Sequence, residues 1–319
     1  MSFGNHEIMS NPRADRVRDI ARLSNARERS KRGEFLAEGP QAVREALRRH
    51  HELEAAGKTG VVHTVYATSV GIERLEELAD PNNIDLVRQV TPEVLAAMAD
   101  TVTPQGMVAV CRMDVSSLED MVARAPRLVA VLCRVQDPGN AGTIVRAADA
   151  AGADAMVITA GSVDIFNPKA VRSTAGSLFH MPVVTGASTE DVVAALKAAG
   201  VQILAADGYG SFDLDELQEE SVRRRTLASG AAPSIDAVET QDGSGSQGDS
   251  ETQGSVVVLE DPTAWLFGNE AQGLNDEELA LADARVAVPL YGIAESLNVG
   301  TAATVCLYAS ARAQRRSNR

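Results

Sequence analysis

"RLVAVLCRVQDPGNAGTIVRAADAAGADAMVIT", residues 127–159, places two apolar runs of strand length on either side of a helical segment rich in small residues. Strand-like and helix-like segments keep alternating to residue 207, and the pattern resumes from "AWLFG" (264–268) to the end of the chain. This alternation predicts βαβ units, which form a parallel sheet with helices on both faces. We therefore expect an α/β domain with a parallel sheet over residues 127–319.

The residues before this domain predict a second, smaller α/β unit. Pro40 is favoured in the first turn of a helix, so we expect a helix to begin there. Short strands are expected on both sides of that helix, at 34–39, 61–68 and 106–112. We place this N-terminal domain at residues 1–115, with a polar linker near 113–126 before the larger domain.

The composition limits the class of protein. At 319 residues the chain is long enough to bury two cores of ordinary size. Its apolar runs are far shorter than the roughly 20 residues that cross a bilayer, and its first residues lack the apolar region of a secretory signal. We therefore expect a cytoplasmic protein that does not enter a membrane. Three widely spaced cysteines and five scattered histidines predict buried thiols, no disulfide framework and no metal site.

Charge is unevenly distributed along the chain, whose net charge is −14. Residues 13–32 hold eight basic and three acidic side chains, whereas residues 215–255 hold nine acidic and three basic ones. A local basic segment can contact phosphates even in an acidic protein, so the net charge does not exclude a nucleic-acid partner. The stretch at about 216–255 is also poor in apolar residues, which predicts a disordered acidic insertion.

Four polar clusters follow strands of the predicted parallel sheet, where open α/β sheets bind their ligands. Their side chains could cap a helix, as we expect of Asn140, or bind phosphate, or accept a proton. Each cluster also has a purely structural interpretation, as a cap, a solvated helix face or a turn, and the residues alone leave both open. The clusters contain Asn140 and Arg146; Asn167, Lys169 and Arg172; Asn269 and Glu270; and Glu295, Ser296 and Asn298.

Three of these clusters resemble the motifs of a known enzyme family. "NAGTIVRAADAAGAD" (140–154), "LFGNEAQGL" (266–274) and "VPLYGIAESLNVGTAATVCLYASAR" (288–312) occur in the order of the motifs of the SpoU (TrmH-type) branch of the SPOUT RNA 2′-O-ribose methyltransferases. The N-terminal domain resembles the L30e-like substrate-binding domain often joined to them. The resemblance implies a deep trefoil knot in the C-terminal domain, a homodimer formed through that domain, and S-adenosyl-L-methionine as methyl donor to a ribose 2′-hydroxyl of structured RNA.

The resemblance also suggests roles for individual residues. Catalytic roles fall on Arg146, Asn140, Glu270, Ser296 and Asn298. The cofactor is expected against Leu266, Gly268, Val288, Leu290, Ile293 and Leu297. RNA contacts are expected from the basic segment and from the second cluster, through Arg18, Arg27, Arg29, Lys31, Arg32 and Arg172.

The chemistry of methyl transfer needs mainly alignment and the removal of one proton. By pKa alone Glu270 would be the base, because an arginine is almost always protonated. The family's arginine is thought to deprotonate or orient the 2′-hydroxyl, and Arg146 matches it. We therefore expect Arg146 to position the RNA phosphate and ribose.

The RNA substrate is less narrowly defined. The basic N-terminal segment favours a large structured RNA, so we expect 23S ribosomal RNA. A transfer-RNA 2′-O-methyltransferase is the alternative, and the basic end "ARAQRRSNR" points towards it. A non-catalytic RNA-binding or ribosome-assembly protein is an alternative of another class, against which the complete set of polar motif residues argues.

Overall fold

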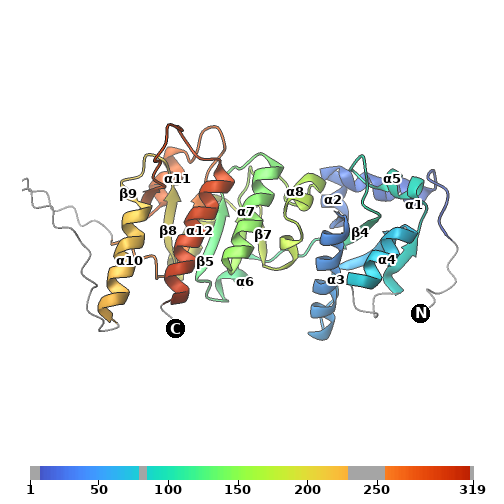
Figure 1. The fold of residues 1–319 in the computed structure, drawn as a ribbon, viewed down its shortest axis with the longest axis horizontal. Coiled ribbons are helices and arrows are strands. Elements are labelled where there is room, and N and C mark those ends of the chain that lie inside the picture. The colour runs from blue at the N-terminus through green and yellow to red at the C-terminus, as the bar shows by residue number, and fades with distance from the viewer. Residues whose placement is uncertain (1–7, 79–84, 229–255, 317–319) are drawn as a thin grey trace, which may run out of the picture.

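The computed structural model describes residues 8–78, 85–228 and 256–316. Two β-sheets lie side by side along the long axis of the molecule (Figure 1). The first sheet uses strands from residues 34–112 and the second uses strands from residues 128–287, and we call the two halves the N-terminal and C-terminal domains. The predicted α/β architecture is confirmed in both.

The N-terminal domain is a four-stranded mixed sheet with helices packed around it. The strand order is β1-β4-β2-β3, in which β4 is antiparallel to both neighbours and β2 is parallel to β3. The strands are β1 (Glu34–Glu38), β2 (Val62–Ala67), β3 (Val87–Gln89) and β4 (Met107–Arg112). The helices are α1 (Asp15–Ala21), the short η1 (Arg22–Ser24), α2 (Ala26–Arg32), α3 (Pro40–Ala55), α4 (Ser69–Leu78) and α5 (Pro92–Met98).

The C-terminal domain is a seven-stranded parallel sheet. Its order is β7-β6-β5-β10-β8-β11-β9, and each neighbouring pair is parallel. The strands are β5 (Leu128–Leu132), β6 (Ala155–Ile158), β7 (Val183–Thr185), β8 (Gln202–Ala206), β9 (Phe212–Asp213), β10 (Thr263–Phe267) and β11 (Ala284–Ala287). The helices are α6 (Leu118–Val122), α7 (Pro138–Ala151), α8 (Pro168–Ser173), η3 (Ser177–Phe179), α9 (Thr189–Ala198), α10 (Leu214–Ala228), α11 (Asp276–Leu281) and α12 (Val299–Arg316).

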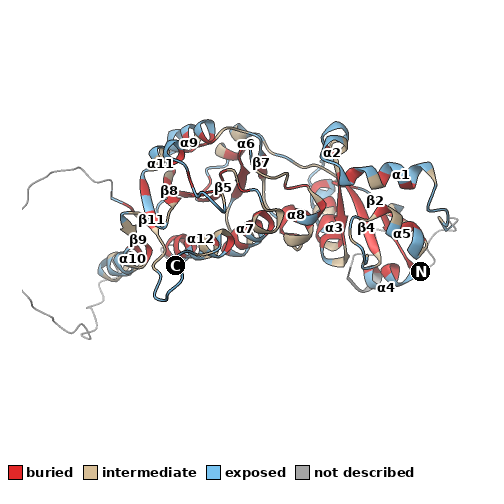
Figure 2. Ribbon diagram, turned by 90° about the horizontal axis from the view of Figure 1, so that it is seen from above, coloured by how far each residue is buried: buried red, intermediate tan, exposed pale blue. Residues whose placement is uncertain are grey.

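Helices cover both faces of this sheet, as the alternation predicts. Figure 2 shows α6, α9 and α11 on one face and α7, α8 and α12 on the other. The chain steps from β5 through β6 to the edge strand β7 and then crosses back to β8 on the far side of β10. The direction of strand order therefore changes next to β5, and open parallel sheets bind their ligands at such a point.

One helix differs from expectation. Residues 216–228, expected to be disordered, lie in α10, which packs against α12; residues 229–255 of that insertion lie outside the described residues. The small residues of α12 serve contacts within the chain. A Cβ at Gly300 would come within 2.9 Å of the Thr143 side chain, so the start of α12 can approach α7 only with glycine there.

Aromatic packing joins the two domains. Phe35 of β1 lies with its ring centroid 4.9 Å from that of Phe166 and 5.9 Å from that of Phe179, both in the C-terminal domain. All three rings are buried. Aromatic pairs at these separations stabilise a contact beyond their buried area, so the junction has a core of its own.

Arg29 is part of this junction. Its residue is only 1% exposed, and its guanidinium donates to the backbone oxygens of Leu23 and Ser24 and to the carboxylate of Asp164, where Nη2 and Oδ2 are 2.6 Å apart. The prediction that Arg29 contacts RNA is therefore wrong, because all of its donors face inward.

Arg172 is also engaged at the junction. Its Nη1 lies 3.2 Å from Oε2 of Glu38, and its Nη2 lies 3.1 Å from Oδ2 of Asp100. Two negatively charged carboxylates thus surround one positively charged guanidinium. The predicted role of Arg172 as a phosphate ligand conflicts with this pairing, since an incoming anion would face a negative surround.

His180, which follows η3, is held by a carboxylate of its own domain through one ring nitrogen and reaches a carboxylate of the N-terminal domain through the other. Nδ1 is 2.8 Å from Oδ2 of Asp149 on α7, and Nε2 is 3.1 Å from Oε2 of Glu45 on α3, a carboxylate that Arg44 also contacts at 2.7 Å. Burial opposes protonation of the ring, but the hydrogen bonds to the two carboxylates prevail and raise the pKa of His180 above its usual 6.5.

Replacing His180 with glutamine should therefore weaken the junction in a pH-dependent way. Because folding raises the pKa of His180, its stabilising effect is complete below the unfolded pKa and is lost as pH rises through the folded pKa. Melting temperatures of wild type and His180→Gln, measured from about pH 5 to about pH 9, should differ most at the acidic end. A difference that stays constant over this range would contradict the assignment.

Candidate active site

A cleft opens at the carboxyl ends of β8, β10 and β11, beside the point where the strand order changes. Its volume is about 610 Å³, within the range of sites that bind cofactors. Three loops form its walls: residues 206–209 after β8, residues 267–274 after β10, and residues 287–297 after β11. The first turn of α12 closes one end through Val299 and Ala302.

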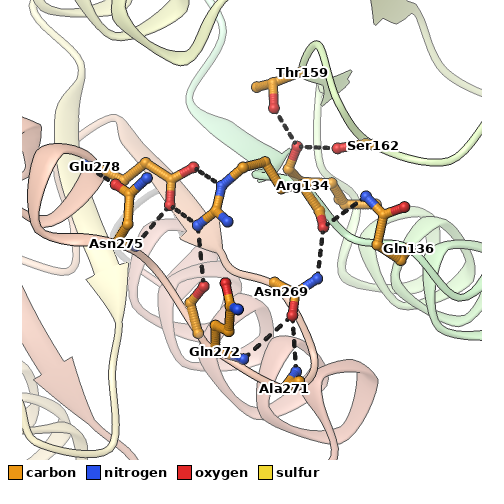
Figure 3. A network of polar contacts seen from close by, with 11 residues as sticks. Arg134, Gln136, Thr159, Ser162, Asn269, Ala271, Gln272, Asn275 and Glu278 are labelled. Carbon is orange, nitrogen blue, oxygen red and sulfur yellow. Dashed lines mark hydrogen bonds and ion pairs between the residues drawn. The ribbon is translucent and has the colours of Figure 1, made fainter.

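An ion pair holds the loop after β10 in place (Figure 3). Arg134, which follows β5, donates Nε to Oε1 of Glu278 at 2.8 Å and Nη2 to Oε2 at 2.7 Å. Burial of Glu278 would raise the pKa of its carboxyl, but the hydrogen bond from Arg134 lowers it below the usual range, so the pair is charged. Arg134 Nη2 also lies 3.4 Å from the carbonyl oxygen of Gly273.

The side chain of Asn269 stabilises the same loop by hydrogen bonds to main-chain groups. Its Nδ2 donates to the carbonyl oxygen of Arg134 at 3.1 Å, while its Oδ1 accepts from the N–H groups of Ala271 and Gln272 (Figure 3). Gly268 packs against the end of the loop so closely that a Cβ there would lie 2.3 Å from the carbonyl carbon of Gly273. Glycine at 268 is therefore required by backbone contact.

Glu270 joins this loop to the start of α7. Its Oε1 accepts from the N–H of Asp137 at 2.9 Å and its Oε2 from the N–H of Gln136 at 3.1 Å. Burial opposes ionisation, but these backbone hydrogen bonds lower the pKa of Glu270. A carboxylate with a lowered pKa is a weak base, so the choice of Glu270 as base from pKa alone is not supported. Asp137 is also the N-cap of α7, the role expected of Asn140.

Two asparagines extend this contact across the site. Asn140 Nδ2 donates to Oε1 of Glu270 at 3.2 Å, and Asn298 Nδ2 donates to Oδ1 of Asn140 at 2.9 Å. Asn298 Oδ1 accepts from the N–H of Gly300, so Asn298 caps α12. The three motifs of the sequence thus meet in one hydrogen-bonded chain from Glu270 to α12.

The loop after β11 borders the cleft with main-chain groups that have no partner elsewhere in the described chain. From Val288 to Leu297 it contains no helix or strand, and its backbone forms no hydrogen bond with another described part of the chain. The hydroxyl of Tyr291 ties this loop to α10 by donating to Asp215, which raises the pKa of Tyr291. Unpaired main-chain donors and acceptors beside a cleft are available to a ligand.

Most residues expected at the cofactor lie on this cleft. Gly268, Val288, Leu290 and Leu297 line it. Leu266 does not, because it is fully buried in the core beneath α9 and α11, and Ile293 does not, because it is fully exposed away from the lining. Direct cofactor contact by Leu266 and Ile293 is therefore not supported.

The expected catalytic residues fall into two groups. Glu270, Asn140 and Asn298 are joined as described, and Ser296 lines the same cleft. Arg146 stands apart: it lies six residues beyond Asn140 on α7, about 9 Å along the helix axis. It is exposed and forms no ion pair or hydrogen bond with any residue that the structure describes.

Two of the basic residues expected to contact RNA are exposed and have no ion-pair partner within the described chain. These are Arg27 and Lys31 on α2. Arg18 pairs with Asp15 in α1, and Arg32 pairs with Glu34. The Arg18–Asp15 pair is exposed and therefore weak, so Arg18 remains available at the surface, whereas the Arg32 side chain is partly buried and also donates to the carbonyl oxygen of Asp19.

The sequence analysis missed one wall of the cleft. Asp207 and Tyr209 follow β8, and Asp207 Oδ2 accepts from Nε of Arg285 at 2.7 Å. The available signal was "ADGYG" (206–210) directly after a predicted strand, the same pattern that identified the other clusters. The pairing of Arg134 with Glu278 had no such signal, because 144 residues separate them.

The fold and the cleft define a cofactor-binding α/β enzyme, and comparison with known proteins specifies it. Residues 127–308 match the SpoU rRNA Methylase family, and residues 14–109 match the MRM3-like substrate binding domain. The chain therefore belongs to the SpoU methylase family.

Two further likenesses extend over nearly the whole chain. A Bacillus subtilis protein, the 23S rRNA (guanosine(2553)-2′-O)-methyltransferase RlmP, is 32% identical over 92% of this chain and 94% of its own length. The AdoMet-bound rRNA methyltransferase of Sinorhizobium meliloti has a similar structure, with a TM-score of 0.71, 27% identity, and 96% and 97% of the two chains covered.

S-adenosylmethionine is the cofactor of this family, and the cleft fits it. Val288, Leu290 and Leu297 offer apolar contact to a flat base, while the free main-chain groups of the same loop can bind its polar edge. Glu295 and Ser296 add polar side chains at the end next to α12. Within the described residues there is no cluster of three or more possible metal ligands, and no helix there is long and apolar enough to span a membrane.

Breaking the Arg134–Glu278 pair should destabilise the C-terminal domain. Arg134→Met leaves a buried carboxylate without its partner, which costs about 3 kcal/mol, whereas adding Glu278→Gln should recover most of that loss because no buried charge remains. Urea unfolding followed by the fluorescence of Trp265, the single tryptophan of the chain, would measure both. Equal destabilisation in the single and the double variant would argue against the pair.

Tyr291→Phe should weaken cofactor binding several-fold without changing the fold. The substitution removes the hydroxyl that ties the loop to Asp215, so binding must then order the loop. Calorimetric titration with S-adenosylmethionine measures the effect, and Tyr308→Phe, an exposed tyrosine on α12, serves as the control. Unchanged affinity in Tyr291→Phe would show that the tether does not preorganise the site.

Proposed function

We propose that this protein transfers the methyl group of S-adenosylmethionine to a ribose 2′-hydroxyl of 23S ribosomal RNA. The observation that carries the proposal is the hydrogen-bonded chain Glu270–Asn140–Asn298, which borders a cofactor-sized cleft in a SpoU methylase fold. The names of the relatives support ribosomal RNA over transfer RNA, since the Bacillus subtilis protein and a Streptomyces viridochromogenes protein, 29% identical, are both named as 23S rRNA 2′-O-methyltransferases.

The residues of the chain contribute mainly by positioning. Bound S-adenosylmethionine supplies a methyl group that is already activated on a sulfonium, so the protein must align a hydroxyl and accept or relay one proton. Glu270 is ionised and accepts hydrogen bonds from two main-chain N–H groups, so it fixes the start of α7 against the loop after β10. Asn140 accepts a hydrogen bond from Asn298, which fixes the start of α12 relative to α7.

Arg146 then has the role of a substrate ligand. Its guanidinium is exposed and free of partners in the described chain, whereas Arg29 and Arg172 are engaged at the domain junction. A free guanidinium matches phosphate and ribose oxygens in a fixed geometry, which orients the 2′-hydroxyl for in-line attack.

The assembly proposed for this enzyme is a cytoplasmic homodimer with a trefoil knot. Val305 and Tyr308 leave apolar surface exposed on α12, which packs against α7, and this exposed surface supports a subunit contact. The knot is supported by β10, which lies between β5 and β8 in the sheet although it follows both in the chain. Sedimentation of the purified protein should give twice the mass of the chain.

Two measurements test the proposed reaction. Mapping of 2′-O-methyl groups in RNA from cells with and without the protein should reveal one missing site in 23S ribosomal RNA. Purified protein should restore it in vitro with labelled S-adenosylmethionine, while transfer RNA stays unlabelled. Labelling of transfer RNA alone would favour the alternative substrate, and labelling of neither would overturn the proposal.

Arg146→Lys should separate binding from turnover. A lysine keeps the positive charge, so RNA affinity should stay within a few-fold of wild type, but it lacks the planar fork and the turnover number should fall about 100-fold. Filter binding and single-turnover rates measure the two effects, with Arg124→Lys, an exposed arginine elsewhere in the domain, as control. Turnover near wild type would refute the positioning role.

A further inference from the structure

A second cleft, of about 200 Å³, lies between the two domains and belongs to no part of the cofactor site. The N-terminal domain contributes the end of β1, the start of α3 and the loop before β4. The C-terminal domain contributes Arg172 of α8 and Ala175, two residues after that helix. The lining residues used below are Glu38, Ala42, Thr103, Gln105, Met107 and Arg172.

Arg172 lines this cleft, and its guanidinium is held in place by two carboxylates. Glu38 holds one terminal nitrogen at 3.2 Å and Asp100 holds the other at 3.1 Å, so both the charge and the orientation of the guanidinium are set. Glu38 is itself fixed, because it accepts hydrogen bonds from the N–H groups of Asp100 and Thr101. The group is a poor phosphate ligand, since two carboxylates surround it, but its plane suits stacking by a nucleobase.

The rest of the lining has the composition that a nucleobase requires. Ala42 and Met107 are buried and form an apolar floor. Thr103 and Gln105 are exposed at the rim, and their side chains make no hydrogen bond with any described residue. A hydroxyl and a side-chain amide can each donate and accept, which is how proteins read the edges of unpaired RNA bases.

The cleft also lies close to the proposed reaction centre. Lys169, three residues before Arg172 on α8, contacts Asp137 at the start of α7 at 3.3 Å. Ser173 Oγ, on the same short helix, donates to the carbonyl oxygen of Pro138 at 3.1 Å. The helix α8 rises only about 4.5 Å from Lys169 to Arg172. An RNA strand that places one ribose near Asn140 can therefore reach the interdomain cleft with a base of a neighbouring nucleotide.

We propose that the interdomain cleft binds one unpaired base of the RNA, near the methylated ribose, by stacking on Arg172 and hydrogen bonding to Thr103 and Gln105. This inference rests on the proposed function and adds a determinant of substrate choice to it. Related enzymes named for a guanosine and for a uridine target show that members of this family differ in what they select.

A cycle of protein and RNA changes tests the subsite. The substrates are RNA hairpins that carry the mapped target nucleotide, each lacking one base within two nucleotides of it. With wild type, removal of one particular base should lower kcat/KM about tenfold, as expected for loss of a stacked base. With Thr103→Ala/Gln105→Ala the complete hairpin should already show part of that loss, and removal of that same base should then cost less than in wild type, because only the stacking on Arg172 is left to lose.

Control measurements separate the subsite from folding and from catalysis in general. Thr59→Ala, another exposed threonine of the N-terminal domain, should behave as wild type. Melting temperature and S-adenosylmethionine affinity should be unchanged in the double variant, because its side chains touch neither core nor cofactor cleft. Arg172→Lys keeps a charge between Glu38 and Asp100 but removes the plane, so it should reproduce the loss.

The outcomes distinguish this inference from the function beneath it. If wild type methylates the hairpin but every base removal costs the double variant as much as wild type, the subsite is refuted and the methyltransferase function stands. If wild type methylates no RNA at all, the proposed function fails and the subsite falls with it.

Discussion

The ion pair between Arg134 and Glu278 is the interaction on which the geometry of the site depends. It ties the residue after β5 to the helix after the β10 loop, and through Gly273 and Asn269 it sets the position of Glu270. A well-packed apolar pair could stabilise the fold as much as a buried ion pair. The contribution of this ion pair is therefore the orientation that it imposes on the two groups. Its two parallel hydrogen bonds define an orientation that a contact between apolar groups would leave free.

Charge pairing at the domain junction separates structural from functional cations. Arg29, Arg172 and His180 each meet carboxylates from the other domain, and this pairing positions the two sheets relative to one another. Arg146, Arg27 and Lys31 have no such partner among the described residues. Since an unpaired exposed cation can bind phosphate without first losing a partner, these three are the better candidates for RNA contact. An acidic protein can thus bind RNA through a few uncommitted groups.

The sequence predicted the fold class and most of the cofactor wall for a local reason. Strand and helix periodicity, and the rule that ligands bind at the carboxyl ends of parallel strands, can both be read from short segments. Gly268, Val288, Leu290 and Leu297 were found in this way together with the resemblance of their motifs. Leu266 and Ile293 were misplaced because a motif shows which residues are near a site and does not show which way each side chain points.

The sequence by itself determined the alternating elements, the parallel sheet and the polar motifs at its strand ends, because these depend on local periodicity and turn chemistry. Only the tertiary structure decided which charges remain free. Whether Arg29 meets RNA or Asp164, and whether Glu270 acts as base or anchor, depends on partners more than 130 residues away in the chain. Spatial neighbours set the burial and hydrogen bonding of a charged group, and sequence spacing carries no information about neighbours so distant.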